Sequence, residues 1–135
     1  MERQIAYRKV GNVYLCYGAK TPFGILFDYI GKFVHSLQQR RFFGFFWTSS
    51  FTHDYLNMPK LIDGEIASFL RRLSNESLLN DTVLILMSDH GLRWGSFRST
   101  YQGMMEERQP FMYAIFPKWF HEDFPRAMRH FRRNA

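Results

Sequence analysis

The stretch Asn80-Asp81-Thr82-Val83-Leu84-Ile85-Leu86-Met87-Ser88-Asp89-His90-Gly91 decides the fold that we predict for this chain. Residues 83–87 are an unbroken apolar run between polar neighbours, with β-branched side chains at Val83 and Ile85. Such a run is typical of a strand that is buried on both faces, as in a parallel sheet covered by helices. The stretch therefore predicts a buried strand followed at once by a carboxylate, an imidazole and a glycine.

Asp89 and His90 stand where an open α/β sheet binds its ligands, just beyond the carboxyl end of a strand. One anionic oxygen and one nitrogen suit a divalent ion such as zinc. Gly91 permits a sharp turn that brings neighbouring side chains to one point. The alternative interpretation is a loop in which Asp89 caps the next turn and His90 has no ligand role.

Two further apolar runs, residues 42–47 and 111–116, predict neighbouring strands of the same sheet. The loop after the first of them carries His53 and Asp54, so it faces the same crevice as Asp89 if the sheet is parallel. We expect the side chains of His53 and Asp89 to lie within roughly 10 Å of each other, the scale of a two-metal cluster. Either His53 or Asp54 would then be a ligand, or Asp54 would orient the imidazole.

The helices are predicted from caps and from apolar spacing. Thr21 followed by Pro22 starts a helix over residues 22–38, and Asn57 followed by Pro59 starts a second one. Apolar side chains at three- and four-residue spacing give each helix a face to bury. The last segment, residues 124–133, has the same spacing with arginines on its other side, which is typical of a docked helix with a solvated face.

The motifs at the organising stretch resemble the sulfatase-like branch of the alkaline phosphatase superfamily. Residues 80–91 resemble its metal-binding turn, and residues 98–110 resemble the segment with the pattern Tyr-Glu-Gly-Gly-x-Arg-x-Pro. Tyr101, Gly103, Arg108 and Pro110 keep that outline, whereas Gln102 replaces the glutamate and the spacing from glycine to arginine is longer. The sequence is most similar to an uncharacterised metazoan sulfatase-like family of unknown function.

The resemblance implies an α/β fold, with a mainly parallel sheet flanked by helices, as part of an alkaline-phosphatase-like domain. It implies Asp89 and His90 as metal ligands, and His53, Asp54 and Arg98 as ligands of a metal or of the substrate's anion. The metal would be zinc, calcium or manganese, bound weakly if at all. The family's nucleophile segment is upstream of the part that this chain resembles, so we expect residues 1–135 to be a single partial domain, its C-terminal portion.

Composition and charge limit the classes of protein to which this chain can belong. The formal net charge is +6, aromatic residues make up 19%, and no apolar run is long enough to span a membrane. Cys16 is the only cysteine, so no internal disulfide is possible. No signal peptide opens the sequence, but the resemblance and two sequons, at Asn75 and Asn80, favour a secretory location for the full-length protein.

Two functions follow from these observations. The first is a fragment of a metal-dependent hydrolase of anionic sulfate or phosphate esters, inactive alone because Cys16 lacks the Cys-x-Pro-x-Arg context of a sulfatase nucleophile. The second is a degenerate, non-catalytic sulfatase-like module that binds a partner through its basic face. No nucleic-acid partner is expected, and the oligomeric state is left open.

Overall fold

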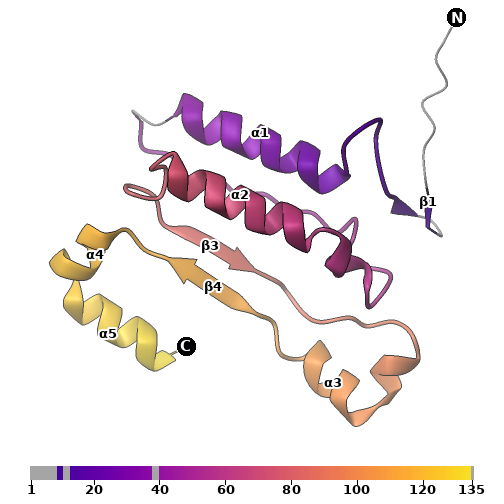
Figure 1. Cartoon of the computed structure of the whole chain (residues 1–135). Coiled ribbons are helices and arrows are strands. Elements are labelled where there is room, and N and C mark those ends of the chain that lie inside the picture. Colours follow the sequence, from indigo (N-terminus) through magenta and orange to yellow (C-terminus); the bar gives the residue numbers. More distant parts are fainter. Residues whose placement is uncertain (1–8, 11–12, 38–39, 135) are drawn as a thin grey trace, which may run out of the picture.

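The computed structural model describes residues 9–10, 13–37 and 40–134. Figure 1 shows three successive layers: α1 (Pro22–Ser36), α2 (Asp63–Asn75), and a strand pair made of β3 (Leu84–Met87) and β4 (Met112–Ile115). Helices α4 (Lys118–Asp123) and α5 (Pro125–Asn134) lie at one end of the strand pair. The turn η2 (Ser96–Ser99) and α3 (Tyr101–Glu107) lie at the other end. A hairpin of β1 (Lys9–Val10) and β2 (Val13–Tyr14) precedes α1, and the turn η1 (Met58–Leu61) precedes α2.

The start of α1 confirms the predicted cap. The Thr21 hydroxyl accepts a hydrogen bond from the backbone N–H of Gly24 at 2.9 Å, and Pro22 occupies the first helical position. The second predicted start is displaced, because Asn57 makes no side-chain cap and opens only the short turn η1. Helix α2 begins at Asp63, whose carboxylate lies in the first turn, where the helix dipole favours negative charge.

Arg72 of α2 joins the two long helices. Its guanidinium donates to the carbonyl of Phe27 at 2.8 Å and lies over the ring of Phe69. The rings of Phe27 and Phe69 stack with centroids 4.5 Å apart. Gly31 makes this crossing possible, since a Cβ there would lie 2.3 Å from the guanidinium. This stacked ring pair and arginine are thus part of the contact between α1 and α2, to which Ile30 and Val34 of α1 also contribute.

Asp28 lies beside the same arginine. Its carboxylate pairs with Lys20 and, at 3.4 Å, with Arg72. The hydrogen bond from Lys20 is the main cause of a lowered pKa at Asp28. Desolvation opposes it in part, and the charge of Lys20 and the pairing with Arg72 lower that pKa further. This exposed network lies at the rim of the helix contact rather than in its core.

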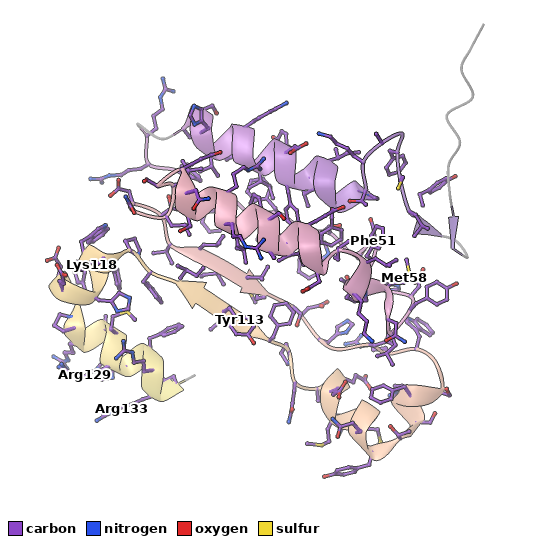
Figure 2. The ribbon with its side chains drawn as sticks, viewed as in Figure 1. Phe51, Met58, Tyr113, Lys118, Arg129 and Arg133 are labelled. Atoms are coloured by element: carbon purple, nitrogen blue, oxygen red, sulfur yellow. The ribbon has the colours of Figure 1, made fainter. Side chains whose placement is uncertain are left out.

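The buried core runs between the two helices and beneath α2. One cluster consists of Phe23, Phe51, Met58 and Ile62, and Figure 2 shows Phe51 and Met58 beside one end of α2. A second cluster consists of Phe69, Leu73 and Leu78, with Leu84 of β3 packed against it. The predicted apolar face of α2 is thus confirmed, and it is this face that holds β3 in place.

The predicted parallel sheet is wrong. Strands β3 and β4 pair antiparallel, with Leu84 opposite Ile115 and Met87 opposite Met112. The segment between them folds as a loop, η2 and the seven-residue α3 at the strand ends, and it does not cross over a face of the pair. A chain that turns back at the strand end returns antiparallel, whereas a parallel partner requires a crossover.

The strand predicted at residues 42–47 is also wrong. The segment has no strand pairing, and two of its rings contact α1 instead. Phe42 packs edge-on against Phe33, and Phe46 packs against Phe33 and Tyr29. The alternate residues Phe43, Phe45 and Trp47 are exposed, so only one side of the segment packs on the helix.

Both faces of the β3–β4 pair are largely exposed. Directly opposed residues share a face, so Leu84, Leu86, Tyr113 and Ile115 lie on the face that packs against the α2 core through Leu84, and Ile85, Met87, Met112 and Ala114 lie on the other face. Tyr113 is 66% exposed on the first face, and Ile85, Met87 and Met112 are each more than half exposed on the second. The apolar run predicted burial on both faces, but the structure covers each face only in part. No helix in the described ranges is long and apolar enough to cross a bilayer.

The burial of Phe69 and the exposure of Phe43 predict different losses of unfolding free energy when each ring is removed. Phe69 is 9% exposed and stacked on Phe27, so Phe69→Ala should leave a cavity and cost about 3–5 kcal/mol of unfolding free energy. Phe43 is 90% exposed, so Phe43→Ala should change that free energy by no more than about 0.5 kcal/mol. Urea unfolding followed by circular dichroism measures both. An equal cost for the two variants would show that residues 42–47 are buried in solution.

Candidate functional site

Ser88 ends the ladder and sets the start of the turn. Its backbone N–H donates to the carbonyl of Phe111 at 3.1 Å, and its hydroxyl accepts from the N–H of Phe111 at 3.2 Å. The two strands therefore stay joined for one residue beyond β3, and Asp89 is the first residue free to leave the pair. Asp89 and His90 thus lie just beyond the carboxyl end of β3, as we predicted.

Asp89 and His90 form a compact unit. The Oδ1 atom of Asp89 accepts from the backbone N–H of His90 at 2.9 Å, and its Oδ2 atom lies 3.3 Å from Nε2 of His90. The Nδ1 atom of His90 lies 2.7 Å from the carbonyl oxygen of Gly91. Because a carbonyl only accepts hydrogen bonds, Nδ1 carries the ring proton, and Nε2 of the neutral ring presents a lone pair.

In the neutral ring, Nε2 is an acceptor, and it lies 3.3 Å from a carboxylate oxygen, Oδ2 of Asp89. Two ligands on a tetrahedral zinc with bonds of 2.0–2.1 Å lie about 3.3 Å apart. The distance between Nε2 and Oδ2 is therefore the one that two ligands of a single ion would have.

His53 and Asp54 form a second pair in the loop that follows residues 42–47. Nδ1 of His53 lies 2.6 Å from Oδ1 of Asp54, so this ring also carries its proton on Nδ1 and exposes Nε2. Of the two roles left open by the sequence, the arrangement favours Asp54 as the group that orients the imidazole. A carboxylate or a carbonyl on Nδ1 is the usual support of a metal-binding histidine.

The His53–Asp54 pair lies beside the loop that follows His90, but it does not form one cluster with Asp89 and His90. The ring of His53 lies beside that of Trp94, with centroids 6.4 Å apart, and Trp94 is four residues beyond His90. Among the described residues, however, no three histidine, cysteine or carboxylate side chains gather as a metal site. The structure thus brings His53 to the loop of the turn and leaves the predicted third ligand outside the Asp89–His90 unit.

Gly91 allows a close backbone contact because it has no side chain. A Cβ on Gly91 would lie 2.2 Å from the carbonyl oxygen of Glu106 and 2.9 Å from Cα of Glu107. The backbone N–H of Gly91 donates to the carbonyl of Glu107 at 3.0 Å. The sequence suggested a sharp turn for this glycine, but its φ lies outside the left-handed region. Its role is the close approach of the end of α3.

Arg98, the predicted anion ligand, pairs with Glu107. Its Nε donates to Oε2 of Glu107 at 2.9 Å, and Nε of Arg93 lies 3.7 Å from Oε1 of the same carboxylate. Sequence reasoning missed the importance of Glu107, because nothing in its local pattern distinguishes it from Glu106. A usable signal was present nonetheless, since two arginines in the polar loop need a counter-charge that the loop itself does not provide.

A comparison with protein families assigns the chain to one of them. A family profile described as "Protein of unknown function (DUF229)" matches residues 1–135. The chain is thus a member of a sulfatase-like family. That family is DUF229, to which the whole of the sequence belongs. No curated protein and no solved structure matches the chain.

The close approach at Gly91 predicts the effect of adding one methyl group. Gly91→Ala should destabilise the fold by about 1–3 kcal/mol, because the new Cβ meets backbone atoms that cannot rotate away. Gly64 is the matched control: it lies in α2 with open space around its Cβ position. Gly64→Ala should stabilise the fold by up to about 1 kcal/mol through helix propensity. Thermal unfolding of both variants measures the difference, and a neutral Gly91→Ala would contradict the contact.

Proposed function

We propose that this chain carries the metal-binding turn of a metal-dependent hydrolase of sulfate or phosphate esters. The observation that carries the proposal is the arrangement of the two histidines. His53 and His90 each have Nδ1 held by an oxygen acceptor, at 2.6 and 2.7 Å, and each keeps Nε2 for a ligand. This is the support that metal-binding imidazoles have in proteins, and Asp89 adds a carboxylate oxygen 3.3 Å from one of the two Nε2 atoms.

Each residue has a definite part in this proposal. Asp89 and His90 would hold a divalent ion, with the carbonyl of Gly91 fixing the tautomer of the imidazole. When bound, such an ion supplies positive charge at the non-bridging oxygens of the ester and stabilises the charge that develops as the bond breaks. Arg98 would contact the same anionic group through its guanidinium. The mixed nitrogen and oxygen ligands favour zinc over calcium, which prefers oxygen alone.

The nucleophile is the part that we do not assign to this sequence. Cys16, the only cysteine, is followed by Tyr-Gly-Ala rather than by the Pro-x-Arg of a sulfatase nucleophile. We therefore propose that residues 1–135 alone do not turn over aryl sulfates or phosphates above the level of an Asp89→Ala variant. A secretory location belongs to the same proposal, and the exposure of both sequon asparagines, Asn75 and Asn80, supports it.

A second function has an observation in its favour. The arginines of α5 are exposed and make no ion pair with a described carboxylate: Arg126, Arg129, Arg132 and Arg133. Figure 2 shows Arg129 and Arg133 on the outside of this helix. A non-catalytic module that binds an acidic partner through this face would not need the Asp89–His90 turn. Substitutions of Asp89 or His90 therefore distinguish the two proposals.

Calorimetric titration of residues 1–135 with zinc tests the metal site. With so few ligands the affinity should be low, and acidification should weaken it because the ligand imidazole must be deprotonated. Asp89→Ala and His90→Ala should each reduce the affinity at least about tenfold, the loss that even an indirect support of a ligand causes.

Two comparisons make this titration specific. His35→Ala is the matched control, because His35 lies exposed on α1, and it should leave the zinc affinity unchanged. Calcium should bind less tightly than zinc to the unaltered chain. Equal zinc affinity in the Asp89→Ala, His90→Ala and His35→Ala variants would refute the metal turn and leave the basic face of α5 as the better account.

A further inference from the structure

Glu107 pairs with two arginines. Its side chain is 16% exposed, whereas the side chains of Arg93 and Arg98 are 57% and 49% exposed. The Nε of Arg98 donates to Oε2 at 2.9 Å, and the Nε of Arg93 lies at ion-pair distance, 3.7 Å, from Oε1. Neither arginine has another hydrogen bond or ion pair within the ranges that the structure describes. Each therefore keeps its terminal Nη1 and Nη2 donors for a ligand.

The backbone of Glu107 fixes this cluster to the turn. The carbonyl of Glu107 accepts from the N–H of Gly91 at 3.0 Å, and the missing side chain of Gly91 permits that distance. One residue thus contacts the metal turn through its main chain and both arginines through its side chain. The arginines are consequently placed by the same peptide that borders His90.

We propose that Glu107 is a positioning residue that aims Arg93 and Arg98 together at a tetrahedral oxyanion, and that Arg93 is the second arm of this anion site. The inference rests on the proposed function and specifies it: the ligand is the sulfate or phosphate group of the ester. A planar guanidinium binds such a group through two parallel N–H donors. Arg98, hydrogen-bonded at Nε, and Arg93, ion-paired to the same carboxylate, present two such pairs with less entropy loss than two free side chains would have.

A positioning role and a purely electrostatic role of Glu107 predict opposite changes in anion affinity when its charge is removed. Removing the negative charge of Glu107 makes the loop more positive, which by charge alone would tighten anion binding. Loss of orientation weakens it, since both arginines become free to rotate. We expect Glu107→Gln to reduce the affinity for inorganic phosphate and for sulfate about tenfold. Glu107→Asp, which keeps the carboxylate, should recover part of the loss.

The chain provides matched controls for each change. Glu106→Gln removes the same charge from the neighbouring residue, whose carboxylate accepts from the amide of Gln102 and contacts neither arginine. It should leave anion affinity equal or slightly higher. Arg93→Gln should weaken binding, and Arg93→Lys should restore little, because an ammonium has no planar fork. Arg108→Gln removes the same charge from a nearby arginine that does not pair with Glu107, and it should have a smaller effect.

Calorimetric or nuclear magnetic resonance titration of residues 1–135 with inorganic phosphate in the presence of EDTA measures these affinities without any metal. Equal or tighter binding by Glu107→Gln overturns the proposal, as does absence of phosphate and sulfate binding by the unaltered chain. If Glu107→Gln does not fold, as judged by circular dichroism, Arg93→Gln decides: full phosphate affinity in that variant overturns the proposal. Zinc titration without phosphate is run in parallel, so loss of the anion site alone leaves the metal turn standing, and loss of zinc binding alone leaves the arginine site standing.

Discussion

The candidate site depends on the absence of a side chain at Gly91. Without a Cβ, this residue lies against the peptide between Glu106 and Glu107 and donates a hydrogen bond to the next carbonyl, that of Glu107, at 3.0 Å. That contact brings the end of α3 to the Asp89–His90 unit, although Glu107 is sixteen positions beyond Gly91 along the chain. The turn that can hold a cation and the carboxylate that holds two arginines are therefore neighbours because of one close backbone approach.

Local signals in the sequence located four of the elements but not their assembly, and they wrongly predicted a strand at residues 42–47. The Thr21 cap and the apolar spacing located α1 and α2, and the apolar runs located β3 and β4 to within two residues. The sheet direction could not be read in this way, because an apolar run indicates burial and does not specify a partner. At residues 42–47 only Phe42 and Phe46 pack on α1, whereas Phe43, Phe45 and Trp47 are exposed, so the apolar run did not indicate burial there.

The residues of the candidate site also differ in whether the local sequence predicts them. Asp89, His90, His53 and Asp54 were predictable because each follows an apolar run, and their pairing with immediate neighbours is a local property. The two loop arginines indicated a carboxylate partner, but the sequence could not identify Glu107 rather than Glu106, since Arg93 and Arg98 are nine or more residues away and meet it only after α3 has folded back. Both histidines have Nδ1 fixed by an adjacent residue, which makes the direction of each ring independent of the missing parallel sheet.

The central claim is that Nε2 of His90 and Oδ2 of Asp89 share a cation while Nδ1 of His90 stays bound to the carbonyl of Gly91. Nitrogen-15 resonance spectra of the His90 ring, recorded with and without zinc, test it most directly. The account predicts a protonated Nδ1 in both states and a zinc-dependent shift at Nε2 that is lost in Asp89→Ala. A proton on Nε2 of the neutral ring, or a zinc-dependent shift at Nδ1, would contradict it.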